Sequence, residues 1–339
     1  MKIYISIPEG KAKRLMLKND IRRRISDIGC VDENKTENQL TSEELVQKAK
    51  EYDVIVSSWG CNRIKGSLLE NHRLKAVVHL GGTVKPCVDA DVFDKGITVM
   101  CGNSAFPPII AESILYQMLT GLKRWHDADA KMKANVGTDA DYYSKSLYRK
   151  KVGLIGYGKI ASHLIKLLKP FETEIMVADK YVTEDIALSE GFLKVSEQLL
   201  CSECDVISIQ HTLNNDTYHL VDSALINTMK ASAVIVNMAR GAVIDEKALI
   251  NRLKKGDLFA VLDVFEEEPL DRDSELRKLS NVFLTPHLGA ESEECCYALA
   301  DAALRQLELF CSGKIPPDII TKKMYMRMSD ERLTAYKKG

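Results

Sequence analysis

The run KVGLIGYGKIA, from Lys151 to Ala161, carries two glycines and a small residue at the spacing G-x-G-x-x-A. Gly156 permits a tight turn, Gly158 lets the backbone approach a pyrophosphate, and Ala161 lets a helix pack closely on the preceding strand. A helix that begins here offers free N–H groups and the positive end of its dipole to phosphate. The run therefore predicts a dinucleotide site, and the alternative is a strand–turn–helix unit whose glycines serve packing alone.

The elements on either side of this turn have the periodicity that the site requires. The apolar run Val152–Ile155 predicts a buried strand, and the leucines from Leu164 to Leu168 recur at helical spacing. Glu174–Ala178 predicts the next strand, which leads into Asp179. An acid about 20 residues after the glycines accepts hydrogen bonds from the adenine ribose and disfavours a 2′-phosphate. We expect NAD as the cofactor. The positive charge of the neighbouring Lys180 would weaken the preference for NAD over NADP.

Four further strands are predicted after Asp179, and polar residues occur where each strand ends. They are Asp205–Gln210, followed by Thr212; Ala233–Met238, followed by Ala239 and Arg240; Phe259–Val264, which carries Asp263 and precedes Glu268; and Val282–Thr285, followed by His287 and Gly289. Ligands of such sheets bind outside the carboxyl ends of the strands. Arg240, Glu268 and His287 would each be ordinary surface or turn residues on their own, but their order on strand ends of one sheet favours a functional site.

Strands also alternate with helices over the first hundred residues, which predicts a smaller parallel α/β domain. Its strands are Lys2–Pro8, Tyr52–Ser58, Leu74–Leu80 and Gly96–Met100, and a helix over Ser42–Lys50 has Ser42 as its N-cap. The strand ends deliver Trp59, His79 and the run Gly82–Lys85, which we expect to face a cleft. Core packing is an equally good interpretation of Trp59.

The chain is predicted to cross between the two domains twice. The irregular stretch Cys101–Phe106 is the first crossing, and Pro107 then opens a long apolar helix that extends to Trp125 and suits packing against another subunit. A loop is expected over 134–146, and a helix over Ser292–Ser312 returns the chain to the first domain. We therefore expect one domain of residues 1–102 and 291–339 around a second domain of residues 103–290.

Composition excludes several classes of protein. The 339 residues include 47 Lys and Arg against 48 Asp and Glu, and this balance argues against a nucleic-acid or membrane-surface protein. Without a signal peptide or a long apolar span, we expect a cytosolic protein. The nine cysteines favour reduced thiols over a disulfide framework. Cys201 and Cys204 form a lone CxxC pair, and they and the adjacent Cys295 and Cys296 are interpreted as buried structural residues, with no metal site expected.

Four ordered motifs give the chain a family resemblance. GYGKIA, VNMARGAVIDEKAL, LDVFEEEP and TPHLGA together resemble the D-isomer-specific 2-hydroxyacid dehydrogenases, such as phosphoglycerate dehydrogenase and hydroxypyruvate reductase. The resemblance covers nearly the whole chain. It implies a Rossmann NAD-binding domain inserted in a flavodoxin-like α/β substrate domain, and a homodimer joined through the NAD domain.

The resemblance also implies roles for particular residues. His287 matches the catalytic acid/base, Glu268 the carboxylate that hydrogen-bonds it, and Arg240 the anchor of the substrate carboxylate. The residue types suit this chemistry, because imidazole titrates near neutral pH and a guanidinium binds a carboxylate in a bidentate fork. The cofactor positions that match are Thr83, Gly156, Gly158, Lys159, Ile160, Asp179, Thr212, Ala239, Asp263 and Gly289.

The first domain departs from the family pattern. The chain reads Val84-Lys85-Pro86-Cys87-Val88-Asp89 where the family often has G-x-D-N-[IV]-D, and Cys101-Gly102-Asn103 where Asn-Thr-Pro is usual. These positions shape the substrate pocket, so the reaction class is predicted and the substrate is not. Gly82 and Lys85 are expected beside the substrate with Arg240, Lys85 reading a second anionic group, although a solvent-exposed Lys85 is an alternative.

Two classes of function fit these observations. The first is an NAD-dependent oxidoreductase that interconverts a D-2-hydroxy acid and its 2-oxoacid. The second is a non-catalytic, NAD-binding regulator on the same fold, such as a corepressor, because relatives of that kind can retain the Arg, Glu and His. Neither a nucleic acid nor a membrane is expected as a partner.

Overall fold

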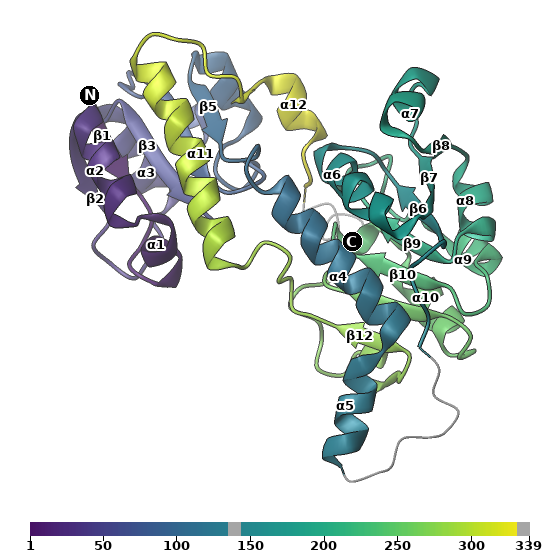
Figure 1. Ribbon diagram of the computed structural model, residues 1–339. Helices are drawn as coiled ribbons and strands as arrows, with labels where there is room; N and C mark the ends of the chain where they lie inside the picture. Colours follow the sequence, from purple (N-terminus) through teal and green to yellow (C-terminus); the bar gives the residue numbers. More distant parts are fainter. Residues whose placement is uncertain (135–143, 331–339) are drawn as a thin grey trace. The chain divides into compact units, whose positions relative to one another are not determined.

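The computed structural model describes residues 1–134 and 144–330, which form two compact units (Figure 1). Unit 1 consists of Met1–Phe106 and Ala290–Asp330, and unit 2 consists of Pro107–Gly289. The sequence places the first crossing four residues earlier, after residue 102, and assigns Ala290 to the other domain. Most of the loop expected over 134–146, and the chain end from residue 331, lie outside the described residues.

Unit 1 is built on a six-stranded sheet in the order β13-β5-β4-β3-β1-β2. Its elements are β1 (Lys2–Ile5), α1 (Lys11–Met16), α2 (Asn19–Ile28), β2 (Cys30–Glu33), α3 (Ser42–Glu51), β3 (Val54–Ser58), β4 (Ala76–Leu80), β5 (Thr98–Cys101), α11 (Glu293–Cys311), β13 (Ile319–Ile320) and α12 (Lys322–Arg327). All pairs are parallel except β13 with β5. The first five strands therefore have the flavodoxin-like order 2-1-3-4-5.

Both faces of this sheet are covered, which explains why its strands read as continuous apolar runs. On one face α1, α2 and α11 pack against residues such as Ile3, Val56 and Val78. On the other face, Ile55, Val77 and Val99 pack with α3 and the loops that follow the strands. The N-cap of α3 is Thr41 and not Ser42 as expected, because the Thr41 side chain and the Glu44 side chain form a reciprocal capping box.

Unit 2 is built on a seven-stranded parallel sheet in the order β12-β11-β10-β9-β6-β7-β8. Its elements are α4 (Pro107–Lys123), α5 (Trp125–Lys133), β6 (Lys151–Ile155), α6 (Lys159–Leu168), β7 (Glu174–Ala178), α7 (Glu184–Glu190), β8 (Leu193–Lys194), α8 (Glu197–Glu203), β9 (Val206–Ile209), α9 (Ser223–Thr228), β10 (Val234–Asn237), α10 (Glu246–Leu253), β11 (Phe259–Leu262) and β12 (Val282–Leu284). In order along the sheet from β8 these strands run 3-2-1-4-5-6, as in a Rossmann fold, with β12 added.

The long helix at the start of unit 2 differs from its prediction. The helix α4 ends at Lys123, since Arg124 adopts a left-handed conformation with φ of 50°, and Trp125 begins the separate helix α5. Trp125 is 68% exposed, whereas Ile114, Met118 and Leu122 of α4 are buried, and α4 packs against α6, β10 and β11. Among the described residues, no helix is long and apolar enough to span a membrane.

Candidate functional site

The predicted site residues of unit 2 follow six strands, β6, β7, β9, β10, β11 and β12, at the carboxyl edge of the sheet (Figure 1). The glycine run follows β6, Asp179 follows β7 and Thr212 follows β9. Arg240 follows β10, and the remaining residues follow β11 and β12. The strand order reverses between β6 and β9, and this switch point is where doubly wound sheets bind their ligands.

The glycine turn leaves room for a phosphate group. Gly156 has φ of 103°, and a Cβ there would lie 2.8 Å from the backbone nitrogen of His211, so a side chain is excluded. Beyond the adjacent residues, no described atom lies within 4 Å of a Cβ built at Gly158. Gly158 is also the N-cap of α6 and makes no side-chain cap hydrogen bond to the first turn. The exposed Lys159 and half-buried Ile160 complete this turn, which fits a pyrophosphate.

Asp179 accepts hydrogen bonds from both the glycine turn and the loop after β7. Its Oδ2 accepts a hydrogen bond from the Tyr157 backbone at 2.9 Å, and its Oδ1 accepts one from the Tyr181 backbone at 2.7 Å. A carboxylate has further lone pairs, so it can accept a ribose hydroxyl as well. Lys180 is directed to Asp216, at 2.7 Å, which reduces its effect on a negative group beside Asp179.

Glu268 and His287 form the central contact of the site. His287 Nδ1 lies 2.7 Å from Glu268 Oε2, although the residues belong to the loops after different strands. Because a carboxylate only accepts hydrogen bonds, Nδ1 carries the proton and Nε2 is left for a substrate. The hydrogen bond that His287 donates to Glu268 raises the pKa of His287 above its usual value of 6.5, against the lowering effect of burial and of Arg240. Burial alone would raise the pKa of Glu268, but the hydrogen bond from His287 holds it below its usual value.

Arg240 is brought to the same site by the turn after β10. Asn237 donates from Nδ2 to the Arg240 carbonyl at 3.0 Å and accepts from the Ala239 backbone at 3.1 Å, which fixes the turn. One guanidinium nitrogen donates to the Ala239 carbonyl at 2.6 Å. Arg240 is close enough to both Glu268 and His287 to influence their pKa values, so the three predicted residues lie together.

Asp263 supports the loop that carries His287. It accepts hydrogen bonds from the backbone of Leu288 at 2.8 Å and of Gly289 at 2.9 Å, and from the Thr285 hydroxyl at 2.5 Å. Its own carbonyl accepts from the His287 backbone at 2.8 Å. His287 has φ of 56°, an uncommon conformation for a residue with a side chain, and these bonds hold it there. Asp263 is predicted as a cofactor position, and its support of His287 was not predicted.

The predicted residues of unit 1 form a separate group. Thr83 donates to the Ser329 carbonyl at 3.5 Å, and Gly82 lies near the ring of Phe106. Lys85 is 8% exposed, and its ammonium lies 3.6 Å from Asp330 and over the Tyr325 ring, so the solvent-exposed alternative is wrong. The roles of Gly82, Thr83 and Lys85 beside a cofactor or substrate stay predictions.

Trp59 and His79, which are both expected to face a cleft, differ in their exposure to solvent. Trp59 is 36% exposed, so it is not a core residue of this unit. His79 is 1% exposed and lies 3.0 Å from the Ser57 hydroxyl, so the expectation that it faces an open cleft is wrong for this unit. The pKa of the nearby Cys61 thiol is lowered to about 5, first by a hydrogen bond with Cys87 and then, against the effect of burial, by His79. This pairing could not be predicted from the sequence.

The four cysteines interpreted as structural residues are buried, as predicted. Cys201, Cys204, Cys295 and Cys296 are all buried, and burial raises the pKa of the first two thiols to about 12. Cys204 Sγ contacts the Met176 sulfur at 3.8 Å. These thiols are therefore protonated packing groups.

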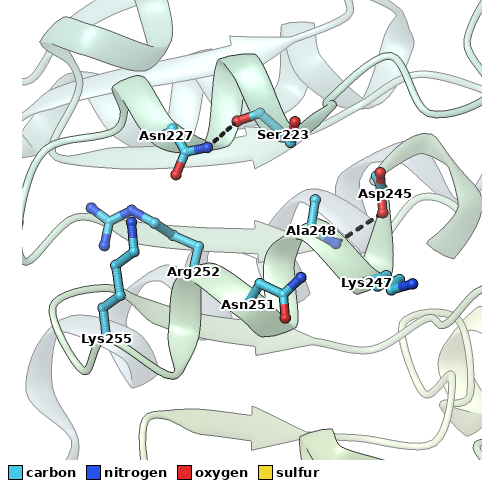
Figure 2. A pocket seen from close by; sticks show the side chains of 8 residues that line it. All are labelled: Ser223, Asn227, Asp245, Lys247, Ala248, Asn251, Arg252 and Lys255. Atoms are coloured by element: carbon cyan, nitrogen blue, oxygen red, sulfur yellow. Dashed lines mark hydrogen bonds between the residues drawn. The ribbon is translucent and has the colours of Figure 1, made fainter.

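A surface hollow of about 410 Å³ lies between α9 and α10 (Figure 2). It is lined by Ser223, Asn227, Asp245, Lys247, Ala248, Asn251, Arg252 and Lys255. Asn227 donates to the Ser223 carbonyl and Asp245 accepts from the Ala248 backbone, so both bonds stay within a helix or its cap. Arg252 pairs with Asp257. The hollow contains none of the predicted site residues, and its Asn227, Asp245 and Arg252 side chains already bond within the fold.

Comparison with known proteins identifies the family. The model of the NAD binding domain of the D-isomer specific 2-hydroxyacid dehydrogenases matches residues 115–289, more than half of the chain. The chain belongs to this family. Its members are NAD-dependent oxidoreductases, and the matched residues lie within unit 2, which is the family's NAD-binding domain.

Relatives cover both units of the chain. A D-3-phosphoglycerate dehydrogenase of Methanocaldococcus jannaschii is 32% identical over 90% of this chain, which spans 58% of that relative. A glyoxylate reductase of Thermococcus litoralis is 30% identical over 82% of this chain and 86% of its own length. The names of these two enzymes give different substrates, so the matches do not select one.

Solved structures agree on the two-domain dehydrogenase fold. The apo structure of D-lactate dehydrogenase from Escherichia coli has a TM-score of 0.74 and 25% identity, with 95% of this chain and 100% of that chain covered. An acyclic imino acid reductase in complex with NADPH and D-Arg has a TM-score of 0.80 at 22% identity over 95% of this chain and 100% of that chain, a likeness of fold alone.

Proposed function

We propose that this protein is an oxidoreductase that interconverts a D-2-hydroxy acid and its 2-oxoacid with NAD. The observation that carries the proposal is the 2.7 Å contact between His287 and Glu268, with Arg240 beside them, on the strand ends of the family's NAD-binding domain. Bound NAD supplies the acceptor or donor of the hydride. The chain's own residues then have to hold the acid and move one proton.

The proton is handled at Nε2 of His287. During oxidation the substrate hydroxyl gives its proton to Nε2 while the hydride leaves the adjacent carbon, and the product is a 2-oxoacid. During reduction the imidazolium returns that proton to the carbonyl oxygen as the hydride arrives. Glu268 stabilises the charged ring through Nδ1, and its hydrogen bond keeps Nε2 directed outward.

Arg240 holds the carboxylate of the substrate in this proposal. Its planar guanidinium can donate two parallel hydrogen bonds, which fixes the orientation of the acid relative to His287. The positive charge also polarises the adjacent carbonyl. The substrates that name the relatives, phosphoglycerate and glyoxylate, share the 2-hydroxy or 2-oxo acid that this arrangement would recognise.

The test is oxidation of NADH by the purified chain with a panel of 2-oxoacids that includes glyoxylate, pyruvate and hydroxypyruvate. We expect turnover with at least one of them. In His287→Ala, turnover should fall by about 10²–10⁴-fold with NADH affinity unchanged. Arg240→Lys should chiefly raise KM, because one ammonium cannot replace a bidentate fork. His72→Ala, in unit 1, is the matched control and should behave as wild type.

Two outcomes would contradict the proposal. A His287→Ala protein with near-wild-type turnover would remove His287 from the chemistry. A wild-type protein that binds NADH but reduces no 2-oxoacid in the panel would favour the alternative of a non-catalytic regulator on this fold.

A further inference from the structure

A row of buried polar side chains crosses the centre of the sheet in unit 1. Ser57, His79 and Cys101 are register partners on the adjacent strands β3, β4 and β5, so they lie on the same face near the carboxyl ends. Ser57 is 3% exposed, His79 is 1% exposed and Cys101 is fully buried. The Ser57 hydroxyl lies 3.0 Å from His79 Nδ1 and restrains the ring. Burying polar groups of this kind costs free energy of desolvation, so their presence at the centre of the sheet calls for an explanation.

Two loops add thiols to this row. Cys61 lies three residues after the end of β3, and Cys87 lies on the loop after β4. One ligand atom from each of Cys61, His79 and Cys87 lies within 4.8 Å of the other two. Apolar side chains, among them Ile64, Val84 and Val88, pack around the group. All of these residues belong to unit 1.

Two thiols and an imidazole are a donor set with a known preference. Thiolate sulfur and imidazole nitrogen suit zinc, whereas magnesium and calcium require oxygen ligands. Zinc holds sulfur at about 2.3 Å and nitrogen at about 2.0–2.1 Å, so the ligand atoms of a tetrahedral site lie roughly 3.5–3.8 Å apart. The three ligand atoms here all lie within 4.8 Å of one another, which is compatible with a single ion.

We propose that Cys61, His79 and Cys87 bind a zinc ion. Three protein ligands leave one tetrahedral position for water or a small anion. Ser57 would act on the metal through the His79 ring, as hydrogen-bond partners of ligating histidines commonly do.

Zinc binding would have a structural consequence within unit 1. The ion would join the loop after β3 to the loop after β4, and the second loop carries Gly82, Thr83 and Lys85. Those three residues are the ones predicted to face cofactor or substrate. Because a metal that binds only the folded state stabilises it, zinc should raise the thermal stability of the chain.

The test uses the full chain, reduced with a phosphine and freed of metal by chelation. Titration with Zn²⁺ should reach one ion per chain by elemental analysis. Co²⁺ should give a sulfur-to-cobalt charge-transfer band and the visible bands of tetrahedral cobalt. Cys61→Ser, Cys87→Ser and His79→Gln should abolish the stoichiometric site. Ser57→Ala should weaken Zn²⁺ binding by about 10–100-fold while the stoichiometry is kept.

Control variants separate a built site from general thiol chemistry. Cys30→Ser removes an exposed thiol, and Cys201→Ser removes a buried thiol of unit 2. Both should bind zinc as wild type does. If the ligand variants fail to fold, the wild-type chain still gives an answer, because Zn²⁺ should protect Cys61 from alkylation and leave Cys30 reactive.

Three outcomes would overturn the proposal. The first is a reduced wild-type chain that shows neither stoichiometric Zn²⁺ nor the cobalt bands. The second is alkylation of Cys61 at the same rate with and without Zn²⁺. The third is a Cys61–Cys87 disulfide that forms with peroxide in a chain whose reduced form binds no metal, which would make the pair a redox site instead.

Discussion

The contact between His287 and Glu268 influences the protonation state of the imidazole. The imidazole is 42% exposed and the carboxylate 35% exposed, so solvent weakens their attraction without removing the hydrogen bond. That bond raises the pKa of His287, and the imidazolium therefore persists to a higher pH than that of a free histidine. A proton donor for 2-oxoacid reduction is then available near neutral pH.

Glu268→Gln should move the pH profile of reduction. With the raised pKa of His287, kcat/KM for a 2-oxoacid is high below the usual histidine value of 6.5 and falls as pH rises through the raised value. Glutamine is neutral, so Glu268→Gln removes the negative charge that helps to raise the pKa of His287. The pH at which kcat/KM falls should therefore shift to a lower value. Glu275→Gln, which breaks a pair with Lys254 before β12, is the control. An unshifted pH profile in Glu268→Gln would exclude this role.

Asp179→Ala should affect both cofactor choice and stability. Removing the carboxylate should narrow the preference for NADH over NADPH, measured as the ratio of their dissociation constants. The variant also leaves the Tyr157 and Tyr181 amides without their partner, which should lower the free energy of unfolding by about 1–3 kcal/mol. Lys180→Ala, whose side chain pairs with Asp216, should keep or strengthen the NADH preference. A wild-type chain that prefers NADPH would contradict the assignment.

At the scale of elements, the strand-to-helix connection after β6 separates two uses of glycine. Gly156 is required by its own backbone conformation and by the close approach of His211. Gly158 has extended backbone, and the space beside it is open among the described atoms. The first glycine therefore serves the fold, and the second leaves room for a phosphate group.

Substituting alanine for each glycine should affect a different property: stability for Gly156→Ala and NADH binding for Gly158→Ala. Gly156→Ala should lower the melting temperature markedly, because the new Cβ meets the His211 backbone at an unfavourable φ. Gly158→Ala should leave the melting temperature of the apo chain nearly unchanged and weaken NADH binding. Calorimetry and NADH fluorescence titration measure the two effects. Equal NADH affinity in Gly158→Ala and wild type would show that no phosphate approaches this residue.

At the scale of the whole molecule, apolar side chains on α4 and α5 are left uncovered by the described chain. Tyr116 is 61% exposed, Trp125 68% and Met132 63%. Both helices belong to unit 2, through which the family resemblance implies a dimer. Large exposed apolar side chains that lie on neighbouring helices are typical of a surface that packs against another subunit.

Trp125→Glu should therefore reduce self-association. Sedimentation velocity of the wild type should show a dimer, and the variant should shift toward a monomer with unchanged secondary structure. Leu188→Glu is the matched control, because Leu188 is 84% exposed on α7, outside the α4 and α5 surface. A wild-type monomer at micromolar concentration, or a variant as dimeric as wild type, would contradict the prediction.

The elements whose signals are local could be predicted from the amino-acid sequence. Apolar runs located the principal strands, the glycine spacing located the turn after β6, and the ordered motifs gave the family. The ends of helices were predicted less accurately than the strands, because local sequence signals mark them weakly. Thr41 and not Ser42 caps α3 because only Thr41 is three residues before Glu44, and the turn at Arg124 has neither proline nor glycine to mark it.

The contacts between side chains far apart in the sequence depend on how the strands are arranged in the sheet. Glu268 and His287 are 19 residues apart and touch because β11 and β12 are neighbours, whereas Asp263 supports His287 through hydrogen bonds that no motif displays. Cys61, His79 and Cys87 come from separate segments, and the parallel register of β3 with β4 brings those segments together. The sequence could not show these contacts, because strand order and register depend on how all the apolar faces pack at once.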